Sequence, residues 1–331
     1  MSKQEVWIPS DRSDKARLHG WLFLPSGGRG GDAKRLPLVI GAHGITCLVA
    51  HGLHDYGQAF AKVGYAALMF DYAGCGESEG LPRDIIDIDA QQRDYQTVIA
   101  WAKKQARFDP EKFVLFGSSY SGGHSVVVAS KDHSLAGVMV ANPFSEGISS
   151  CIATLSIWTL PLLVVAHIDW LVGLLFGNRV PPIYIPITFP FDPKTGRSNV
   201  WRPGMLTSGD TAQGFYEMKQ ASAGQGGAGA GGADRPNRIA VRGMVQVPTF
   251  SPRAAAAGVK CPLLVVIPRG RDYLCPTRDA VQMAKNAARG RVVEVGTARS
   301  GHFSFYPGVT NDNCSQEAME AMEAFLKELS G

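Results

Sequence analysis

The chain has 331 residues, of which 45% are hydrophobic and 19% are charged. This composition excludes a disordered, collagen-like or small disulfide-stabilised protein, and the length allows two domains or one large domain that carries an insertion. The net charge of +4 comes without a long run of either sign, so we expect no nucleic-acid partner.

Cysteine usage and the first residues suggest a compartment. Six cysteines are scattered along the chain with no Cys-x-x-Cys pair, and residues 1–10 lack the basic and then apolar pattern of a secretory signal. A reducing, cytoplasmic location fits these features best.

From Leu38 onward, short apolar runs alternate with longer segments of helical periodicity, which indicates a parallel sheet with crossover helices. The predicted strands are Leu38–Ala42, Ala66–Phe70, Phe113–Phe116, Gly137–Val140, Leu263–Ile267 and Val292–Val295. The predicted helices are Leu53–Val63, Ile85–Gln105, Gly122–Ser130, Thr277–Ala288 and Ser315–Leu329. Before them, Glu5–Pro9 and Leu18–Leu24 are predicted to pair as antiparallel strands at one edge of the sheet.

This alternation stops near Pro143 and resumes near Val259. We therefore expect a core of residues 1–145 and 259–331, with residues 146–258 inserted as an apolar, mainly helical cap. Residues 144–200 contain only six charged side chains and many aromatic residues and prolines, as a segment that covers an apolar space would. Residues 221–233, almost all Gly and Ala, are predicted to be a mobile loop within the cap.

The stretch Cys151–Gly177 is the most membrane-like part of the chain, but Pro161, His167 and Asp169 interrupt it. A charge near the centre of a membrane span costs about 3 kcal/mol on insertion scales. We therefore expect one or two helices packed against protein or acyl chains, and no stable membrane insertion.

The run Phe113–Gly123 is predicted to be a strand, a tight turn and the start of a helix, where an α/β-hydrolase carries its nucleophile. Ser119 lies three positions beyond the predicted strand end, between the small residues Gly117 and Ser121 that such a strained turn needs. Ser121 offers a second register, but it would already lie inside the helix. Ser119 is therefore the predicted nucleophile.

A serine hydroxyl needs a base, and the base needs an acid that orients it; in this arrangement the three follow in the order Ser, acid, His. Asp272 follows the predicted strand Leu263–Ile267, and His302 follows the predicted strand Val292–Val295. Carboxyl ends of parallel strands share one edge of the sheet, so the three side chains are predicted to form a catalytic triad.

Two backbone N–H groups should hold the oxyanion that forms when the serine attacks a carbonyl. One belongs to Tyr120, the residue after the predicted nucleophile. The other is predicted to be that of Ile45, in the His43-Gly44 turn after the first parallel strand.

At these residues the sequence resembles the α/β-hydrolase superfamily, over about 36–145 and 259–329. The matching features, in order, are His43-Gly44, the loop 70–78, the turn at Ser119, Asp272 with Pro276, and Gly301-His302-Phe303. Ala73 stands where relatives often have arginine, and Gly270 is displaced by one position, but neither departure removes a catalytic group. The run 301–308 and the loop after Phe70 resemble the branch of dienelactone hydrolases and X-Pro acyl-peptidases, which includes fungal polyketide hydrolases and acyltransferases.

The resemblance implies a mostly parallel eight-stranded sheet with helices on both faces, and a serine-dependent acyl enzyme without metal or organic cofactor. We expect a small hydrophobic acyl substrate, which a carrier protein or coenzyme A could present, and a homo-oligomer stays open. The residues expected to contact substrate are His43, Trp158, Trp170, Tyr273 and Phe303.

Alternatives remain. The same triad could serve an acyltransferase or a cyclising polyketide-release enzyme, and a non-catalytic lipid-binding or membrane-associated protein could keep the fold. His43, His51 and His54 do not complete a metal site, because no carboxylate or cysteine spacing joins them. Asp71 and Glu77 are more consistent with a structural turn than with an acid–base pair, because Gly74 and Gly76 interrupt their loop.

Overall fold

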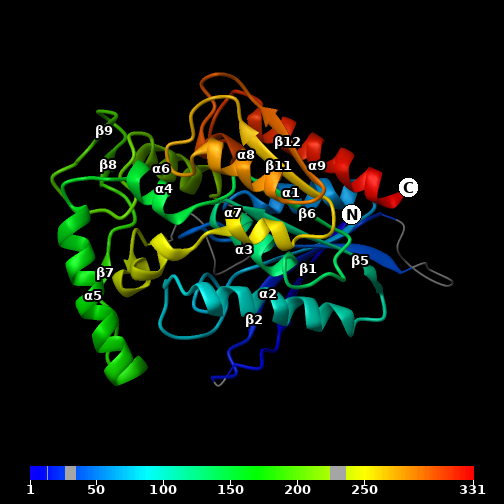
Figure 1. Ribbon diagram of the computed structural model, residues 1–331, viewed down its shortest axis with the longest axis horizontal. Helices are drawn as coiled ribbons and strands as arrows, with labels where there is room; N and C mark the ends of the chain where they lie inside the picture. Colours follow the sequence, from blue (N-terminus) through cyan, green and yellow to red (C-terminus); the bar gives the residue numbers. More distant parts are fainter. Residues whose placement is uncertain (13, 27–34, 224–235) are drawn as a thin grey trace.

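Figure 1 shows the computed structural model, which describes residues 1–12, 14–26, 35–223 and 236–331. In this part of the chain, eight strands form one sheet in the order β1-β2-β4-β3-β5-β6-β11-β12. β1 is antiparallel to β2 and β2 is antiparallel to β4, whereas the other neighbours are parallel. The strands are β1 Ser2–Ile8, β2 Leu18–Leu24, β3 Leu36–Ala42, β4 Ala66–Phe70, β5 Phe108–Ser118, β6 Gly137–Ala141, β11 Leu263–Pro268 and β12 Gly290–Val295. The predicted mostly parallel eight-stranded sheet is confirmed.

Helices cover both faces of this sheet (Figure 1). Every residue of β4, β6 and β11 is buried, as expected for apolar strands with helices on either side. On one face lie α1 (Leu53–Lys62) and α9 (Cys314–Ser330), whose side chains share an apolar cluster with the sheet. On the other face lie α2 (Ile88–Lys103), α3 (Tyr120–Ala129) and α8 (Thr277–Asn286).

The ends of the elements follow local chemistry. The structure gives β4 the predicted bounds. By contrast, α2 begins at Ile88 rather than Ile85, because the Asp87 side chain accepts the N–H of Ala90 at 2.9 Å and caps the helix. The helix α3 begins at Tyr120, two residues before the predicted Gly122, because the turn after β5 is a single residue.

Residues 146–258 lie between β6 and β11 in the chain. They contain the helices α4 Gly147–Ala153, α5 Thr159–Phe176, α6 Thr211–Ala221 and α7 Pro252–Ala255, the short strands β7 Tyr184–Ile185, β8 Phe191–Asp192, β9 Arg197–Ser198 and β10 Ile239–Ala240, and the 3₁₀ helices η1 Gly177–Arg179, η3 Val241–Thr249 and η4 Ala256–Gly258. A third apolar cluster joins this segment to the sheet domain, with Leu162 and Phe215 packed against a set that includes Tyr120 and Phe303. The predicted Gly/Ala loop 221–233 falls mostly outside the described residues.

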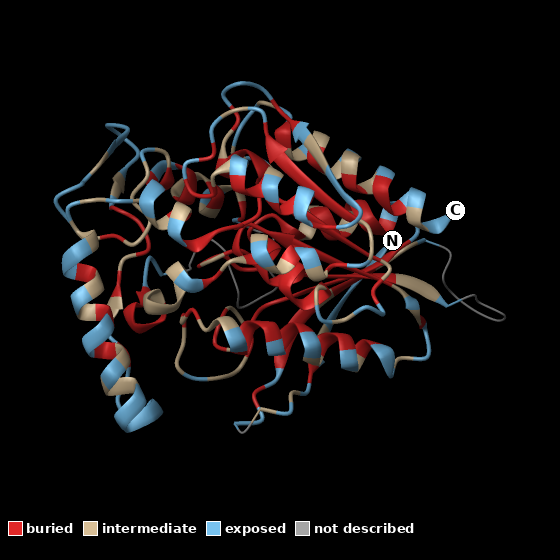
Figure 2. Cartoon of the chain, in the orientation of Figure 1, coloured by how far each residue is buried: buried red, intermediate tan, exposed pale blue. Residues whose placement is uncertain are grey.

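The expectation of packed helices over Cys151–Gly177 was wrong in one respect. The stretch does form helices, α4 and α5, but much of α5 faces away from the rest of the protein (Figure 2). Within the described ranges, Thr159–Arg179 is the one helical stretch with the length and apolar composition of a membrane span, and only 17% of its most apolar window is buried. Residues Leu162, Ala166 and Asp169 form its inner side.

Candidate active site

Ser119 lies between β5 and α3 in a backbone conformation that few residues adopt. Its φ of 56° and ψ of −121° place it outside the regions that L-residues prefer. A Cβ on Gly117 would lie 2.3 Å from the carbonyl oxygen of Ser121, so only glycine allows the strand and the helix to approach this closely. The sharp turn projects Ser119 into the wall of a cavity.

The second serine of the turn is engaged in structural hydrogen bonds. The Ser121 hydroxyl donates to the carbonyl oxygen of Ala42 and accepts the N–H of Ser118 at 2.9 Å. The Ser121 side chain is completely buried, and its hydrogen bond to Ala42 connects α3 with the end of β3. Ser121 therefore does not face the cavity, whereas Ser119 does.

The structure brings Ser119, His302 and Asp272 together from three segments of the chain. His302 Nε2 lies 3.0 Å from Ser119 Oγ, and His302 Nδ1 lies 2.8 Å from Asp272 Oδ2. His302 begins the 3₁₀ helix η5 (His302–Phe305), after β12, and Asp272 follows β11. All three side chains are buried.

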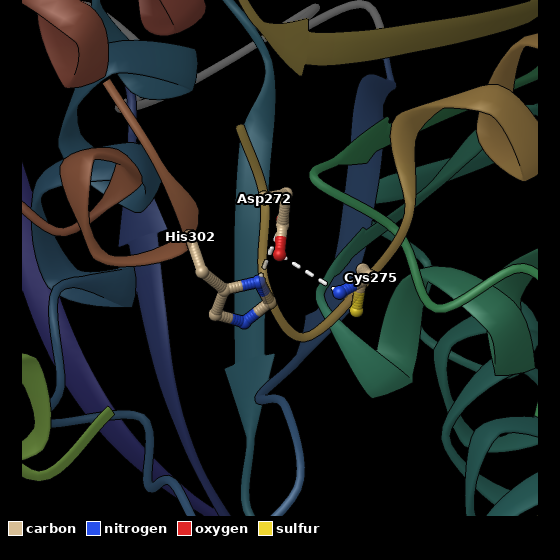
Figure 3. Close-up of side chains that lie close together, drawn as sticks. All are labelled: Asp272, Cys275 and His302. Atoms are coloured by element: carbon tan, nitrogen blue, oxygen red, sulfur yellow. Dashed lines mark hydrogen bonds and ion pairs between the residues drawn. The ribbon is translucent and has the colours of Figure 1, made fainter. Parts of the chain in front are cut away.

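The loop after β11 holds the Asp272 carboxylate in place. Its Oδ1 accepts the N–H groups of Leu274 and Cys275, each at 2.8 Å, which leaves Oδ2 directed at His302 (Figure 3). Because Asp272 accepts the Nδ1 hydrogen, Nε2 of His302 can accept the hydroxyl hydrogen of Ser119. This is the tautomer that a general base requires.

Asp272 also sets the acid–base behaviour of His302. Burial alone would lower the pKa of His302, but the charge of Asp272 and its hydrogen bond raise that pKa well above the ordinary value of 6.5. The imidazolium form is therefore stabilised in this site.

Asn142, at the end of β6, is a neighbour of His302 that the sequence analysis missed. Its side-chain amide donates to the backbone oxygen of His302 at 3.0 Å. The same nitrogen lies 3.2 Å from His302 Nδ1, but that ring nitrogen already directs its hydrogen at Asp272, so this approach is a contact only. The position of Asn142 two residues after the predicted strand Gly137–Val140 was the available signal.

The two backbone groups predicted for the oxyanion lie beside Ser119. Ile45 and Tyr120 both line the cavity with Ser119, and Tyr120 opens α3, so its N–H has no acceptor within the helix. A Cβ on Gly44 would lie 2.8 Å from the Cβ of Ser119, which places the backbone of this loop directly against the serine.

Buried polar groups support the loop that carries Ile45. Asp71 Oδ1 accepts the N–H of Val49 at 2.9 Å and lies 3.4 Å from His43 Nε2, and its other oxygen lies 3.8 Å from His19. Burial alone would raise the pKa of Asp71, but the contact with His19 and the charge of His43 lower it overall. The charged Asp71 side chain thus stabilises the loop that carries Ile45, which we call the oxyanion loop, and it does not contact Ser119 or His302.

The cavity beside Ser119 has a volume of about 260 Å³, and its lining is mostly apolar. The sheet domain contributes Ser119, His302 and the loop at Ile45, while α4, α5 and η3 contribute aliphatic side chains such as Ile152, Leu162 and Val247. Three cysteines, Cys47, Cys151 and Cys275, also stand in its wall. Such a space suits an apolar acyl group whose reactive carbon points at Ser119.

The five residues expected to contact substrate are placed differently from one another. Phe303 lines the cavity beside His302, but His43, Trp158, Trp170 and Tyr273 do not. Trp158 donates through its indole to the carbonyl oxygen of Val200, and Trp170 lines a separate hollow near Asp87. Tyr273 is exposed and lies under Arg271 in a cation–π contact.

Three buried side chains of the site are of the types that can bind a metal ion. Asp272, Cys275 and His302 offer ligand atoms within 4.8 Å of one another (Figure 3). However, the hydrogen bonds of Asp272 to His302 and to two backbone N–H groups already occupy the carboxylate oxygens that would face an ion. His51 and His54, which the sequence analysis did not assign to a metal site, both have structural contacts. His51 Nδ1 accepts the N–H of Leu48, and the ring of His54 packs edge-on against Phe23.

Comparison with known proteins adds the wider relationship. Residues 11–156 match the X-Pro dipeptidyl-peptidase family (S15 family). The chain is 28% identical to the quorum-quenching protein AidA of Acinetobacter baumannii, over 96% of this chain and 93% of that protein. It is 32% identical to a polyketide transferase of Stachybotrys chlorohalonatus, over 53% of this chain and 54% of that protein. The crystal structure of the α/β hydrolase GrgF from Penicillium covers 99% of both chains with a TM-score of 0.74 and 20% identity, so the two share a fold.

Proposed function

We propose that this enzyme, a member of the α/β-hydrolase superfamily, is a serine-dependent acyl hydrolase that cleaves an ester, thioester or lactone of a hydrophobic acyl group. The observation that carries the proposal is the continuous series of hydrogen bonds from Asp272 through His302 to Ser119. Its Ser119 end lines an apolar cavity. The series joins a nucleophile, a base and an acid in the order in which acyl transfer uses them.

In the first half of the reaction, His302 Nε2 accepts the hydroxyl proton while Ser119 Oγ bonds to the carbonyl carbon of the substrate. The carbonyl oxygen becomes an oxyanion, which the N–H groups of Ile45 and Tyr120 would stabilise by about 3 kcal/mol each. The intermediate then collapses: the bond to the leaving oxygen or sulfur breaks, and His302 returns the proton to that atom. An acyl group remains on Ser119.

In the second half, water takes the place of the leaving group. His302 Nε2 accepts a proton from the water, whose oxygen bonds to the acyl carbon, and the collapse of the second intermediate returns the proton to Ser119 Oγ. The carboxylic acid leaves and the free serine is restored. Throughout, the hydrogen bond from His302 Nδ1 to Asp272 stabilises the imidazolium form of His302.

A second candidate function uses the same steps with a different acceptor. The cavity wall is mostly apolar, and an alcohol or carbon nucleophile that fits it would compete with water for the acyl enzyme. The similarity to a named polyketide transferase supports this alternative. A polyketide-derived acyl group, presented by a carrier protein or coenzyme A, is the substrate class that we propose for either acceptor.

The test is the intact mass of the protein after treatment with a fluorophosphonate. We expect one adduct on the wild type and on Ser121→Ala, no adduct on Ser119→Ala, and peptide mapping that places the adduct on Ser119. Turnover of acyl thioesters by Ser119→Ala should fall roughly a million-fold. An unlabelled wild type that still binds fatty acyl ligands equally well after Ser119→Ala would instead favour a non-catalytic lipid-binding protein.

The choice between water and another acceptor needs product analysis. Acyl thioesters are incubated with increasing concentrations of small alcohols, and the acid and ester products are quantified. Acid as the sole product at every alcohol concentration supports the hydrolase. Ester formation that rises to saturation supports the transferase.

A further inference from the structure

The helix α5 is apolar on its outer as well as its inner side. Between Glu146 and Arg179 the chain has a single charged residue, Asp169, which lies on the inner side of the helix. There Asp169 forms a bidentate ion pair with Arg242, at 3.0 and 2.9 Å. The pair fixes the inner side to η3, and the only ionisable group on the opposite side of α5 is the exposed imidazole of His167, whose Nδ1 lies 2.7 Å from the carbonyl oxygen of Leu163.

We define the outer face of α5 by seven large apolar side chains, each more than half exposed. They are Leu160, Val164, Ile168, Leu171, Leu174, Leu175 and Phe176. Their spacing of three and four residues places most of them in one row along the helix. In Figure 2 much of α5 has the pale blue of exposed residues, and Figure 1 shows the helix at the edge of the molecule.

Exposed apolar side chains are concentrated in this part of the protein. Among the described residues, thirteen of the nineteen large apolar side chains that are exposed lie within residues 148–183. With roughly 100 Å² of apolar surface on each and about 60% of it open, the seven side chains of the outer face present about 400 Å², and the other six bring this part of the protein to about 800 Å². The outer face alone is thus as large as the largest apolar patch usual on a monomer, and the whole set matches what one partner contributes to a standard protein interface.

We propose that the outer face of α5 packs against the same face of a second copy of this chain. A charged partner would find no opposite charge on this helix, since Asp169 is already paired on the inner side. Helices that lie flat on a lipid surface carry Lys and Arg along their polar side, and α5 has none. A second copy offers the same uncharged row and the same area.

The two helices run antiparallel about a two-fold axis. In this orientation the two helix dipoles are antiparallel, which is favourable. The outer face of one copy then contacts the same outer face of the other copy, as a two-fold symmetric interface requires. The axis passes near Ile168, the midpoint of the span from Leu160 to Phe176. Ile168 therefore faces its own copy, while Leu160 faces Phe176 of the other helix, about 24 Å from the other Leu160 at a rise of 1.5 Å per residue.

Helix α5 also belongs to the cavity wall, to which it supplies Leu162 and Leu163. The helix thus serves the cavity with its inner side and the dimer with its outer face, and the dimer does not depend on which acyl reaction occurs within the cavity.

The experiment measures the mass of the full chain in solution by light scattering, at tens of micromolar and without detergent. We expect the wild type at twice the mass of one chain. The double variant Val164→Glu, Leu171→Glu should have the mass of one chain, with an unchanged far-ultraviolet circular dichroism spectrum and a dimer dissociation constant at least 100-fold higher. The control Gln282→Glu, Gln316→Glu adds the same charge on exposed positions of α8 and α9 and should remain dimeric.

A cross-linking experiment tests the arrangement without relying on the charged variants. Under mild oxidation, Ile168→Cys should form a disulfide-linked dimer, whereas Leu160→Cys and the wild type, with its native cysteines, should not. Cross-linking of Leu160→Cys in place of Ile168→Cys would overturn the antiparallel pairing. A wild type with the mass of one chain would overturn the dimer, and its co-flotation with phosphatidylcholine vesicles would assign the outer face of α5 to a lipid surface.

Discussion

The side-chain amide of Asn142 donates to the backbone oxygen of His302, whose ring lies between Ser119 and Asp272. The bond of 3.0 Å joins the end of β6 to the start of η5, 160 residues later in the chain. The ring of His302 must reach both Ser119 and Asp272, so the position of its backbone matters. The hydrogen bond from Asn142 holds that backbone in place. Asn142 is thus a positioning residue rather than a catalytic one.

The variant Asn142→Ala should lower kcat roughly 10- to 100-fold with little change in KM, because a small displacement of His302 lengthens the path of the proton. Steady-state kinetics on an acyl ester checks this split. Asn286→Ala, which removes an exposed amide that donates to the carbonyl oxygen of Arg253, is the control. An equal loss of kcat in both variants would contradict a specific role for Asn142.

The pH dependence of kcat/KM should report the raised pKa of His302. The base must be neutral to accept the proton from Ser119, so activity should rise with pH through a limb that lies above pH 6.5. In Asp272→Asn the carboxylate that raises this pKa is absent, so the limb should move to lower pH while kcat falls about 10⁴-fold. A limb at the same pH in both proteins would show that Asp272 does not set the pKa.

Asp71 should affect the oxyanion loop without changing the triad. In Asp71→Asn the N–H of Val49 and the ring of His43 lose a charged partner, and the loop with Ile45 becomes less well fixed. We expect kcat to fall about 10- to 100-fold while the rising limb of the pH profile stays in place. A shifted limb would place Asp71 in electrostatic contact with His302 instead.

The lowered pKa of Asp71 also has a consequence for stability. The stabilisation from a carboxylate of this kind is fully present above the unfolded value of 3.8 and is lost as the pH falls through the lower folded value. Asp71 also raises the pKa of His19, against the effect of burial, so the free energy of unfolding of the wild type should exceed that of Asp71→Asn by more at about pH 6 than at about pH 8. Urea denaturation at both pH values measures this difference.

The ion pair of Asp169 and Arg242 should control how firmly α5 is attached. Removal of one partner leaves a buried charge, so Asp169→Ala should destabilise the packing of α5 by about 3–5 kcal/mol. Limited proteolysis should then cut near residues 177–183 faster than in the wild type. The double variant Asp169→Leu, Arg242→Met, in which no buried charge remains, should regain most of the resistance.

The sequence predicted the sheet and the chain order of Ser119, Asp272 and His302, because apolar runs mark the parallel strands and reactive residues follow their carboxyl ends. It could not reveal Asn142 as a partner of His302, because that contact depends on how two loops 160 residues apart meet. Nor could the aromatic residues of the inserted segment be assigned. The periodicity that marks Thr159–Phe176 as a helix does not say which side faces the cavity, and Trp170 lies on another side.

The exposure of α5 has a related cause. The expectation of packed helices over Cys151–Gly177 came from Pro161, His167 and Asp169, which interrupt the stretch and make a membrane span costly. The contacts of one chain bury only its inner side. An expectation of burial that considers one chain alone does not include surface that becomes buried in a dimer.

One of the three thiols in the cavity wall, that of Cys275, lies close enough to His302 for its oxidation state to matter. Burial raises the pKa of the Cys275 thiol, which keeps it protonated and slow to oxidise, yet its sulfur lies within 4.8 Å of a ring nitrogen of His302. Conversion of that sulfur to a sulfinate would place a permanent negative charge beside the imidazole and a polar group in an apolar wall. The raised pKa of Cys275, which keeps this sulfur protonated, thus protects the wall beside His302 from peroxide.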